Sequence, residues 1–455
     1  MSKQLTRWVG IGIGAWLLAA LFLAMGAPGA LAQDEKDADV IVQFGDQNVA
    51  IRSITFTDSI SGLRALEMSG LDVITATSDY GTLVCSIDGV GCPAEDCFCS
   101  SSYWGYNYWG DGAWQGYMTG AASSVISQTG AIEGWRWGEF GAAVAPAPEA
   151  LSAELALDQI ASTQQPTGGF GSLGSTADVM LALGANHEAA SAWQAPPDGF
   201  SLLDYWSQDD IDGDEHPTNA ARYAAASPAA AGKLYLAAVS AGADPQAFAG
   251  EDIVAAVKAN YDDMSGAFGP TNWDQAFGML AMAGIADEPL PVEMVQTLVD
   301  QANPDGSWGY LPPSAEGEAF GDTNSTALAV QALRAAGVCS PDGLIYLRSA
   351  QNEDGGFGND LDAETDANST AYVIQAILAA GQDPTSAAWS VNGNTPFDAL
   401  ASLQLADGSF AWMTGQGANP LATHQAVPAL LRTSFVTDNV TACSEIFLPM
   451  ISAAQ

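Results

Sequence analysis

The second half of the chain is built from repeats. Residues 322–337 (DTNSTALAVQALRAAG) and 366–381 (DANSTAYVIQAILAAG) are identical at ten of sixteen positions. A Gly-rich turn closed by an aromatic residue precedes each, and copies of this turn place glycines at positions 266, 306, 355 and 408, spaced by 40, 49 and 53 residues. Periods of this size are typical of stacked supersecondary units, none of which buries its apolar face alone. The repeats therefore predict an array of similar units.

Each unit reads as helices joined by that turn. Ala327, Val330 and Leu333 follow the helical period. We expect Ser325 or Thr326 to cap the start of this helix and Gly337 to end it. The Gln that opens each turn can bond the backbone groups that the turn frees. About six helix pairs between residues 151 and 437 would close into a ring, with weaker copies of the turn at 165–170, 261–268 and around 197–200.

The first part of the chain has a different composition. Residues 40–57 are rich in β-branched side chains and read as two strands around the turn at 46–48. The sequence predicts a short helix at 61–68 and further strands at 83–87, 115–118 and 131–137. The expected fold class is a small β-rich α+β domain followed by an α/α toroid. The expected segments are a signal peptide (1–32), the β-rich domain (33–141), a Pro/Ala linker (142–150), the toroid (151–437) and a tail (438–455).

The N-terminus has the pattern of a secretory signal peptide. Lys3 and Arg7 precede an apolar run from Trp8 to Met25, and Ala30-Leu31-Ala32 is an A-x-A cleavage site. We favour cleavage and export over the alternative, an uncleaved membrane anchor. The expected location is secreted or extracellular, with no membrane association after cleavage, and the tail could serve for attachment to a cell surface.

The six cysteines fit export. Cys85, Cys92, Cys97 and Cys99 cluster within fifteen residues, and Cys339 and Cys443 lie far apart. An even count in an exported chain favours disulfides. We expect two bridges inside the cluster, whose pairing stays open, and one long bridge from Cys339 to Cys443. Zinc is the alternative for the cluster, but no His lies near it.

The charge balance excludes some partners. The chain has 12 Lys and Arg against 53 Asp and Glu, a formal net charge of −41. Binding to nucleic acid needs clustered basic side chains, so neither a nucleic acid nor an anionic membrane surface is an expected partner.

The repeats resemble those of the prenyltransferase/squalene-cyclase family. The resemblance is carried by the Q-x-x-D-G-S/G-W/F turn and the STA-x-x-x-QAL helix, recurs in several copies and covers about residues 151–437. It implies a toroid of six helix pairs around a central cavity. A fold of this kind does not by itself specify a reaction.

The first part resembles the small β domain of the transcobalamin/intrinsic-factor family. Residues 81–91 (GTLVCSIDGVG), the Tyr- and Trp-rich run that follows and residues 130–138 (GAIEGWRWG) carry this resemblance. That family holds cobalamin between such a domain and a toroid. The order of the two parts is reversed in this chain, with the β domain first.

The toroid enzymes of the resembled family need groups that this sequence shows only in part. A zinc prenyltransferase would require an Asp, a Cys and a His, and His424 has no Asp-x-Cys partner, so we expect it in the core or lining a helix. A class II cyclase needs a protonated Asp in a D-x-D-D motif. The nearest run, from Asp360 to Asp366, lacks the last Asp of that motif. Asp362 or Asp366 is the catalytic acid in this alternative, and a solvated or capping loop is the competing interpretation.

A second acidic run has part of a calcium-binding pattern. Asp210, Asp212 and Asp214 are spaced as in the first half of a calcium loop, but Ala221 stands where the bidentate Glu is required. An acidic surface turn is the simpler interpretation.

The most unusual non-repeat feature is aromatic. Residues 103–117 carry seven Tyr or Trp in fifteen positions. A small domain cannot bury so many rings fully, so we expect them near the mouth of a cleft, against a ligand or packed on the toroid as a seam between the two parts. The candidate ligand-binding residues are Trp104, Tyr106, Trp109 and Trp114, with Asp322, Asn324, Asp366 and Asn368 as polar lining or, alternatively, helix caps.

These features together predict an exported, non-catalytic binding protein. By resemblance, its ligand is a corrinoid such as cobalamin, or another large planar molecule, and no cofactor is required for a reaction. The alternatives are a terpene-cyclase- or prenyltransferase-like enzyme and a structural surface protein that mediates protein contacts.

Overall fold

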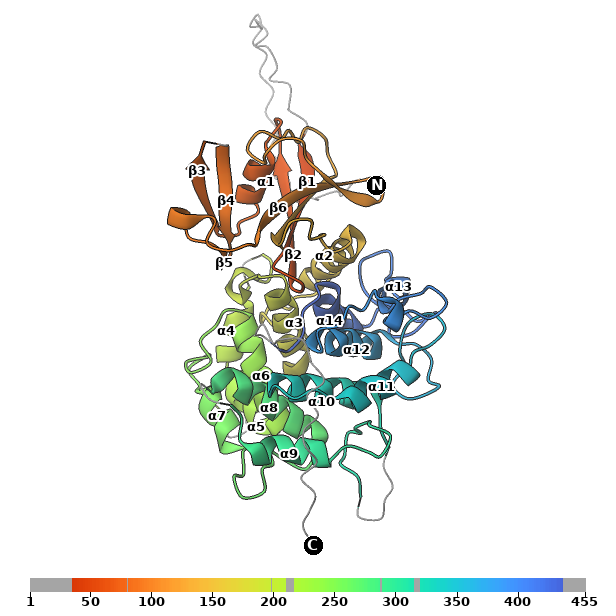
Figure 1. The fold of residues 1–455 in the computed structure, drawn as a ribbon. Helices are drawn as coiled ribbons and strands as arrows, with labels where there is room; N and C mark the ends of the chain where they lie inside the picture. Colours follow the sequence, from red (N-terminus) through yellow and green to blue (C-terminus); the bar gives the residue numbers. More distant parts are fainter. Residues whose placement is uncertain are drawn as a thin grey trace, which may run out of the picture.

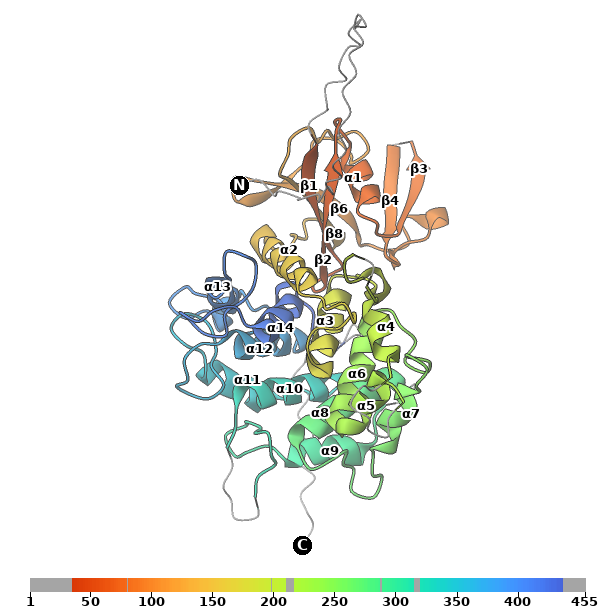
Figure 2. The same ribbon diagram turned by 180° about the vertical axis from the view of Figure 1, so that it is seen from behind.

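A computed structural model describes residues 35–79, 81–197, 199–209, 217–286, 289–314 and 320–436 (Figure 1). The expected signal peptide, the calcium candidates Asp210, Asp212 and Asp214, and the C-terminal tail lie outside the described residues. In both ribbon views the β-rich part sits at one end of the helical part (Figures 1 and 2).

The first two predicted strands form a hairpin. Strand β1 (Lys36–Gln43) pairs antiparallel with β2 (Val49–Phe56). The turn between them closes through a hydrogen bond from the Phe44 N–H to the Asn48 carbonyl, and Asn48 adopts a φ of 59°. Asn tolerates this left-handed conformation better than most residues, which explains why the strands reverse here.

The hairpin belongs to a five-stranded sheet with the order β2-β1-β8-β6-β7. The other strands are β6 (Tyr103–Gly110), β7 (Ala113–Gly116) and β8 (Ala131–Gly138), and β1 runs parallel to β8. Strand β6 is the aromatic run, which the sequence analysis did not assign to a strand. A smaller sheet contains β3 (Val73–Ser78), β4 (Gly81–Ile87) and β5 (Val90–Gly91), and helix α1 (Gly62–Met68) accompanies them.

The clustered cysteines form two local disulfides, as expected. Cys85 bonds to Cys97, and Cys92 bonds to Cys99. The first bridge ties strand β4 to the loop that follows β5, and the second closes that loop on itself. Cys339 is also disulfide-bonded, and its expected partner, Cys443, lies outside the described residues.

The helical part closes into a ring. Within the described residues, six inner helices contact one another in sequence order, and the last contacts the first. These helices are α3 (Leu173–Ala185), α6 (Pro228–Ser240), α8 (Asn272–Ile285), α10 (Thr323–Ala335), α12 (Ala367–Ala379) and α14 (Pro420–Leu430). Their apolar faces bury a continuous core, as expected for units that cannot fold alone.

Further helices pack around this inner ring (Figure 2). They are α2 (Ala147–Ser162), α4 (Leu202–Ser207), α5 (Asn219–Ala226), α7 (Ile253–Ala259), α9 (Val292–Asp300), α11 (Pro341–Ser349) and α13 (Pro396–Ser402). Because α2 begins at Ala147, the end of the expected Pro/Ala linker is helical.

The repeated turn is built as the sequence suggests. In the copy before α12, the Gln351 side-chain amide donates to the Gly355 carbonyl at 2.8 Å, and Gly355 has a φ of 87°. The Phe357 ring is fully buried beneath the turn, and its N–H donates to the Thr370 hydroxyl at 3.0 Å. Thr370 belongs to the STA motif, so the motif links each turn to the helix that follows it.

The predicted cap of the repeat helix was wrong. Asp322, rather than Ser325 or Thr326, is the N-cap of α10, and its carboxylate accepts the Ser325 N–H at 2.7 Å. The Thr326 hydroxyl is used by the turn instead, where it accepts the Trp308 N–H. The predicted end of the helix is confirmed, since Gly337 has a φ of 76° just past the last turn.

Strand β2 joins the two parts of the molecule. At its start, the N–H groups of Val49 and of the preceding turn residue Asn48 donate to the carbonyls of Leu431 and Arg432, just past α14. Further along, the Asn186 side chain accepts the Ile51 N–H at 2.8 Å and donates to the Ile51 carbonyl at 3.2 Å. An edge strand paired in this way has its exposed backbone groups satisfied. The sheet is therefore held firmly against one end of the ring.

Candidate functional site

A cleft of about 700 Å³ lies where the β hairpin meets the ring. One wall comes from the hairpin turn, from Arg136 on β8 and from residues 143–146. The other wall comes from the C-terminal end of α12, the loop at 381–385 and Arg432. Its lining is mainly polar, and the side chains that supply hydrogen-bonding groups are Gln43, Asp46, Gln47, Asn48, Arg136, Gln382, Asp383, Thr385, Arg432 and Ser434.

Arg432 is anchored behind this cleft. Its Nε and Nη2 donate to the two carboxylate oxygens of Glu149 at 2.9 and 3.2 Å. Burial raises the pKa of Glu149, and the Arg432 charge opposes that rise. Nη1 of Arg432 lies 3.6 Å from the Asp383 carboxylate, which is largely exposed. Paired and hydrogen-bonded on both oxygens, the Glu149 charge is well compensated for a buried group.

Arg136 forms the opposite side of the cleft and is paired differently. Its Nη2 donates to Asp46 at 2.8 Å. The Arg136 side chain is 11% exposed, whereas that of Asp46 is 99% exposed. Its Nε is buried and has no hydrogen-bond partner among the described residues.

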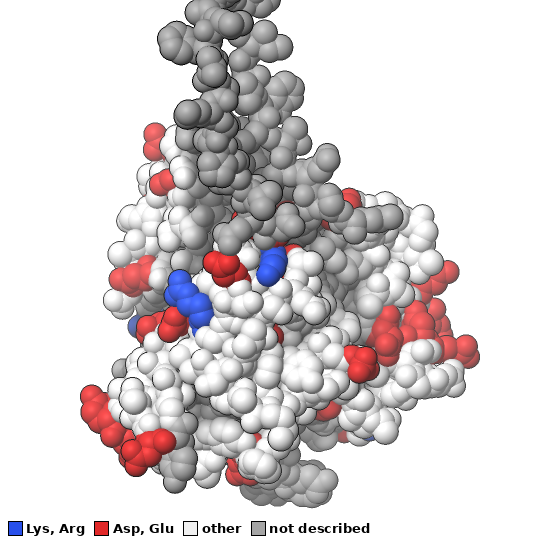
Figure 3. All heavy atoms as spheres, turned by 90° about the horizontal axis from the view of Figure 1, so that it is seen from above, with Lys and Arg blue, Asp and Glu red and all other residues white. Residues whose placement is uncertain are grey.

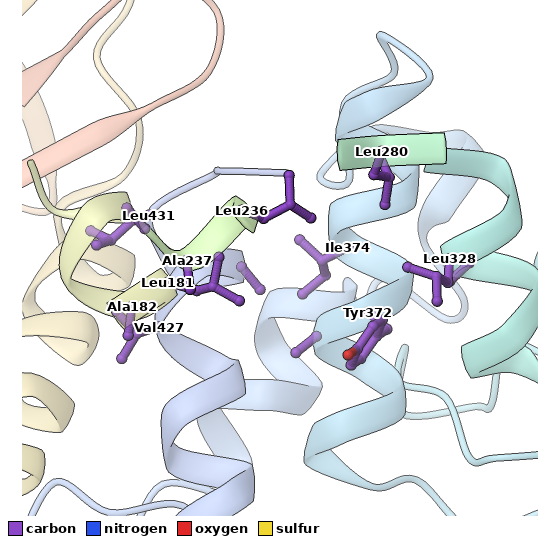
Figure 4. Close-up of a cluster of buried hydrophobic side chains, with 14 of the residues drawn as sticks. Leu181, Ala182, Leu236, Ala237, Leu280, Leu328, Tyr372, Ile374, Val427 and Leu431 are labelled. Atoms are coloured by element: carbon purple, nitrogen blue, oxygen red, sulfur yellow. The ribbon is translucent and has the colours of Figure 1, made fainter. Parts of the chain in front are cut away.

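A second, smaller cavity of about 290 Å³ adjoins the cleft at the mouth of the ring. Its walls are mostly apolar and come from the C-terminal halves of α3, α6 and α8. Leu181, Leu236 and Leu280 are among the side chains that converge from different inner helices (Figure 4). Asn48, Ser434 and Val436 line both spaces, so the cleft and the cavity are neighbours.

Residues 433–436 enter the ring from the same end. The Phe435 ring contacts Phe277 of α8 and Tyr372 of α12, with centroids 5.7 and 6.1 Å apart. Its N–H donates to the side chain of Gln331 on α10 at 3.0 Å. The middle of the ring is therefore occupied in part by the chain itself, and the open space lies at the end that faces the β sheet.

Two of the predicted aromatic residues point into the β-rich part. Trp104 is buried there, and its indole N–H donates to the Val90 carbonyl. The Tyr106 hydroxyl donates to Glu133 at 2.5 Å, and Tyr117 donates to the other oxygen of the same carboxylate at 2.8 Å. Burial raises the pKa of Glu133 to about 6, although both tyrosine hydrogen bonds oppose this change. These rings form the core of the β-rich part and do not line the cleft.

The other two predicted aromatic residues lie at the seam. Trp109 and Trp114 pair edge to face, with centroids 5.2 Å apart, and pack against the apolar cluster that runs from the β hairpin into the ring. The Trp114 indole donates to the Ala145 carbonyl at 2.8 Å, behind the cleft wall. Neither ring is part of the cleft lining. Successive side chains of a strand point to opposite faces of the sheet, so Trp109 lies on the other face of β6 from Trp104 and Tyr106. This alternation can be read from the sequence.

The four predicted polar residues lie at the other end of the ring. Asp322 and Asp366 are the N-caps of α10 and α12, where Asp366 accepts the Ser369 N–H at 2.8 Å. Burial raises the pKa of both carboxyls. Asn368 donates to Gln425, and Asn324 donates to Asn359. The cleft is lined by the opposite end of α12, about 20 Å away for a helix of thirteen residues.

The two candidate cyclase acids lie in different surroundings. Asp362 is exposed in a turn, with a φ of 65°. An acid strong enough to protonate an alkene must be shielded from water and held protonated. Asp366 is buried, but its two oxygens are occupied by the N–H and the hydroxyl of Ser369.

Sequence reasoning missed a buried charged cluster in the ring. Lys233 of α6 is paired with Asp178 of α3 at 2.7 Å, and both side chains are largely buried. Burial is the largest single influence and lowers the pKa of the Lys233 ammonium group, but Asp178, Tyr223 and Tyr372 together outweigh it and raise that pKa. His424 on α14 is also buried, with an edge-to-face contact to Phe170, and burial lowers its pKa to about 4. This position agrees with the expectation that His424 belongs to the core.

Two further observations bear on metals and membranes. Among the described residues, no group of three or more His, Cys, Asp or Glu is arranged to hold a metal ion, and the four clustered cysteines form disulfides with one another. No helix in the described part of the chain is long and apolar enough to span a membrane. Seen from above, acidic side chains gather toward the rim, and the few basic ones lie beside acidic neighbours (Figure 3).

The fold is thus a closed α/α ring joined at one end to a β-rich part. No protein-family model matches the chain, and a search of curated proteins found no match. Among solved structures, the type II terpene cyclase MstE from Scytonema is 12% identical, with a TM-score of 0.41, and the match covers 62% of this chain and 97% of that chain.

Two other solved structures are similar to parts of the chain. Candida albicans protein geranylgeranyltransferase-I is 13% identical, with a TM-score of 0.38, over 57% of this chain and 83% of that chain. Haptocorrin in complex with Cbi is 17% identical, with a TM-score of 0.19, over 24% of this chain. That match spans about a quarter (26%) of the haptocorrin chain. Activity and ligand do not follow from similarities of this size.

Proposed function

We propose that the protein is an exported, non-catalytic binding protein that holds a large, planar small molecule of the corrinoid type. The ligand occupies the cleft between the β hairpin and the ring. The observation that carries this proposal is the preformed cleft of about 700 Å³ at the junction of the two parts. Ligand sites commonly lie at such junctions and combine a shaped wall with a few polar groups.

The chemistry of the walls supports a ligand that carries many polar substituents. Amide side chains of Gln47, Asn48 and Gln382 reach the cleft from both parts. The adjoining apolar cavity at the ring mouth can receive a less polar portion of the same molecule. The hydrogen bonds between β2 and the ring hold the two walls in place, so little has to be ordered when the ligand binds.

Export is part of the same proposal. The two disulfides of the β-rich part are of the kind that persists in oxidising compartments. They complement the signal-peptide pattern at the N-terminus.

Thermal melting with added ligand tests the proposal. Cobalamin at a hundredfold excess over its dissociation constant should stabilise the protein by about 2.7 kcal/mol, which raises the melting temperature. Thr385→Trp places a bulky ring in the cleft lining and should abolish the shift. Gln296→Trp adds the same ring to the exposed face of α9 and should leave the shift intact.

Two outcomes would overturn the proposal. If corrinoids produce no shift in the wild type, the ligand class is wrong. If the purified protein converts a polyprenyl substrate to a cyclised product, and Asp366→Asn abolishes that reaction, the protein is an enzyme of the terpene-cyclase type.

A further inference from the structure

The two arginines of the cleft present the same guanidinium edge to different partners. Arg432 uses Nε and Nη2 to hold both oxygens of Glu149, an arrangement completed inside the protein. On Arg136, Nη2 holds one oxygen of Asp46, and Nε has no acceptor among the described residues. The Arg136 edge is therefore only half used.

Asp46 is a weaker partner for Arg136 than Glu149 is for Arg432. Asp46 is 99% exposed, so water competes for its carboxylate at all times, whereas the guanidinium is 11% exposed. A charge pair with a fully exposed member adds little to stability. The Arg136 guanidinium lines the cleft and is largely buried, so it gains more from an acceptor that is itself shielded from water. This asymmetry favours replacement of Asp46 by another oxyanion.

We propose that Arg136 binds an oxyanion of the cleft's ligand, a phosphate or carboxylate group, in place of Asp46. This inference rests on the proposed function, because it assigns a subsite within the same cleft. The oxyanion accepts from Nη2 at the position that the Asp46 carboxylate holds now. Asp46 is already almost fully exposed, so its carboxylate stays hydrated after it leaves Nη2.

The surrounding charges decide how strong such binding is. The chain has a net charge of −41, and Asp383 lies on the opposite wall of the cleft. A free anion therefore binds weakly and in a salt-dependent way, because the field around the protein opposes its approach. An oxyanion that is part of a larger ligand is held by the rest of that ligand.

Titration with inorganic phosphate, and in parallel with acetate, followed by NMR tests the subsite alone and shows which oxyanion it prefers. Asp46→Asn removes the competing carboxylate and should tighten anion binding by about two- to fivefold, the factor expected for an exposed ion pair. Arg136→Gln should abolish it. Arg64→Gln, which removes one member of an exposed ion pair on α1, should change nothing. Anion binding that survives Arg136→Gln, or that weakens in Asp46→Asn, overturns the subsite.

A matched pair of ligands separates this inference from the proposed function. Cobalamin carries a phosphodiester that cobinamide lacks. Arg136→Gln should weaken cobalamin binding at least tenfold and leave cobinamide binding unchanged. If both corrinoids bind equally well to the wild type and to the variant, the proposed function stands and the oxyanion subsite is wrong. An unchanged spectrum of backbone amides outside the cleft shows that Arg136→Gln is folded.

Discussion

His424 gives the ring a built-in sensitivity to acid. The imidazole is 2% exposed among α14 and its neighbours, and its Nδ1 has no hydrogen-bond partner among the described residues. Burial lowers its pKa to about 4, the nearby Lys233 charge acts in the same direction, and Asp178 acts against it. In the unfolded chain the same group takes up a proton near pH 6.5.

The size of the effect follows from these two values. Between pH 6.5 and pH 4 the unfolded state binds the proton and the folded state does not, so stability falls as the pH falls. From pH 7 to pH 5 this single group should remove about 2 kcal/mol from the free energy of unfolding. His424→Gln keeps a polar side chain of similar size without the charge, and should lose this part of the pH dependence.

Urea unfolding of both proteins at pH 7 and pH 5 measures the effect. The difference in unfolding free energy between wild type and His424→Gln should change by about 2 kcal/mol between the two pH values, with the variant gaining at pH 5. The surface carboxylates are the same in both proteins, so their contribution to the pH dependence of stability cancels in this difference. If the two proteins lose stability in parallel, His424 takes up its proton as readily in the folded state as in the unfolded one, and the reasoning fails.

Three further predictions follow from the same structure. The pKa of Glu133 is raised to about 6, so its contribution to the free energy of unfolding falls by about 2 kcal/mol as the pH rises from 4.5 through 6. Glu133→Gln should remove this pH dependence, which is opposite in sign to that of His424. The same urea unfolding assay measures it. Gly355→Ala should destabilise the protein more than Gly45→Ala. Both glycines have a φ near 90°, but a Cβ at position 355 would lie 2.5 Å from the Thr395 carbonyl oxygen, whereas nothing lies within 4 Å of a Cβ at position 45. Equal losses of melting temperature in the two variants would contradict this prediction. Phe435→Ala should cost about 2–3 kcal/mol in urea unfolding, because the ring packs on Phe277 and Tyr372, and no loss would mean that the segment at 433–436 does not stabilise the ring.

Several structural features could be read from the sequence because they depend on residues close together in the chain. The helix and turn of each repeat are specified locally by an apolar period, a Gly with positive φ and a Gln that bonds the turn. The two local disulfides likewise join cysteines 12 and 7 residues apart. Even the misassigned cap at Asp322 was an error of only three or four residues within one turn, where several side chains compete for the same N–H groups.

The candidate site, by contrast, was decided by the tertiary structure. The sequence supplied a run of aromatic residues, but strand pairing sends Trp104 into the β-rich core and Trp114 to the seam. The inner-helix caps were correctly placed on inner helices, yet the β sheet docks on the opposite end of the ring. Arg136 and Arg432 meet across one cleft only because the ring closes and β2 pairs with the end of α14. Local periodicity sets which residues form each element, whereas the way these elements pack together decides which side chains from distant parts of the chain share a cavity.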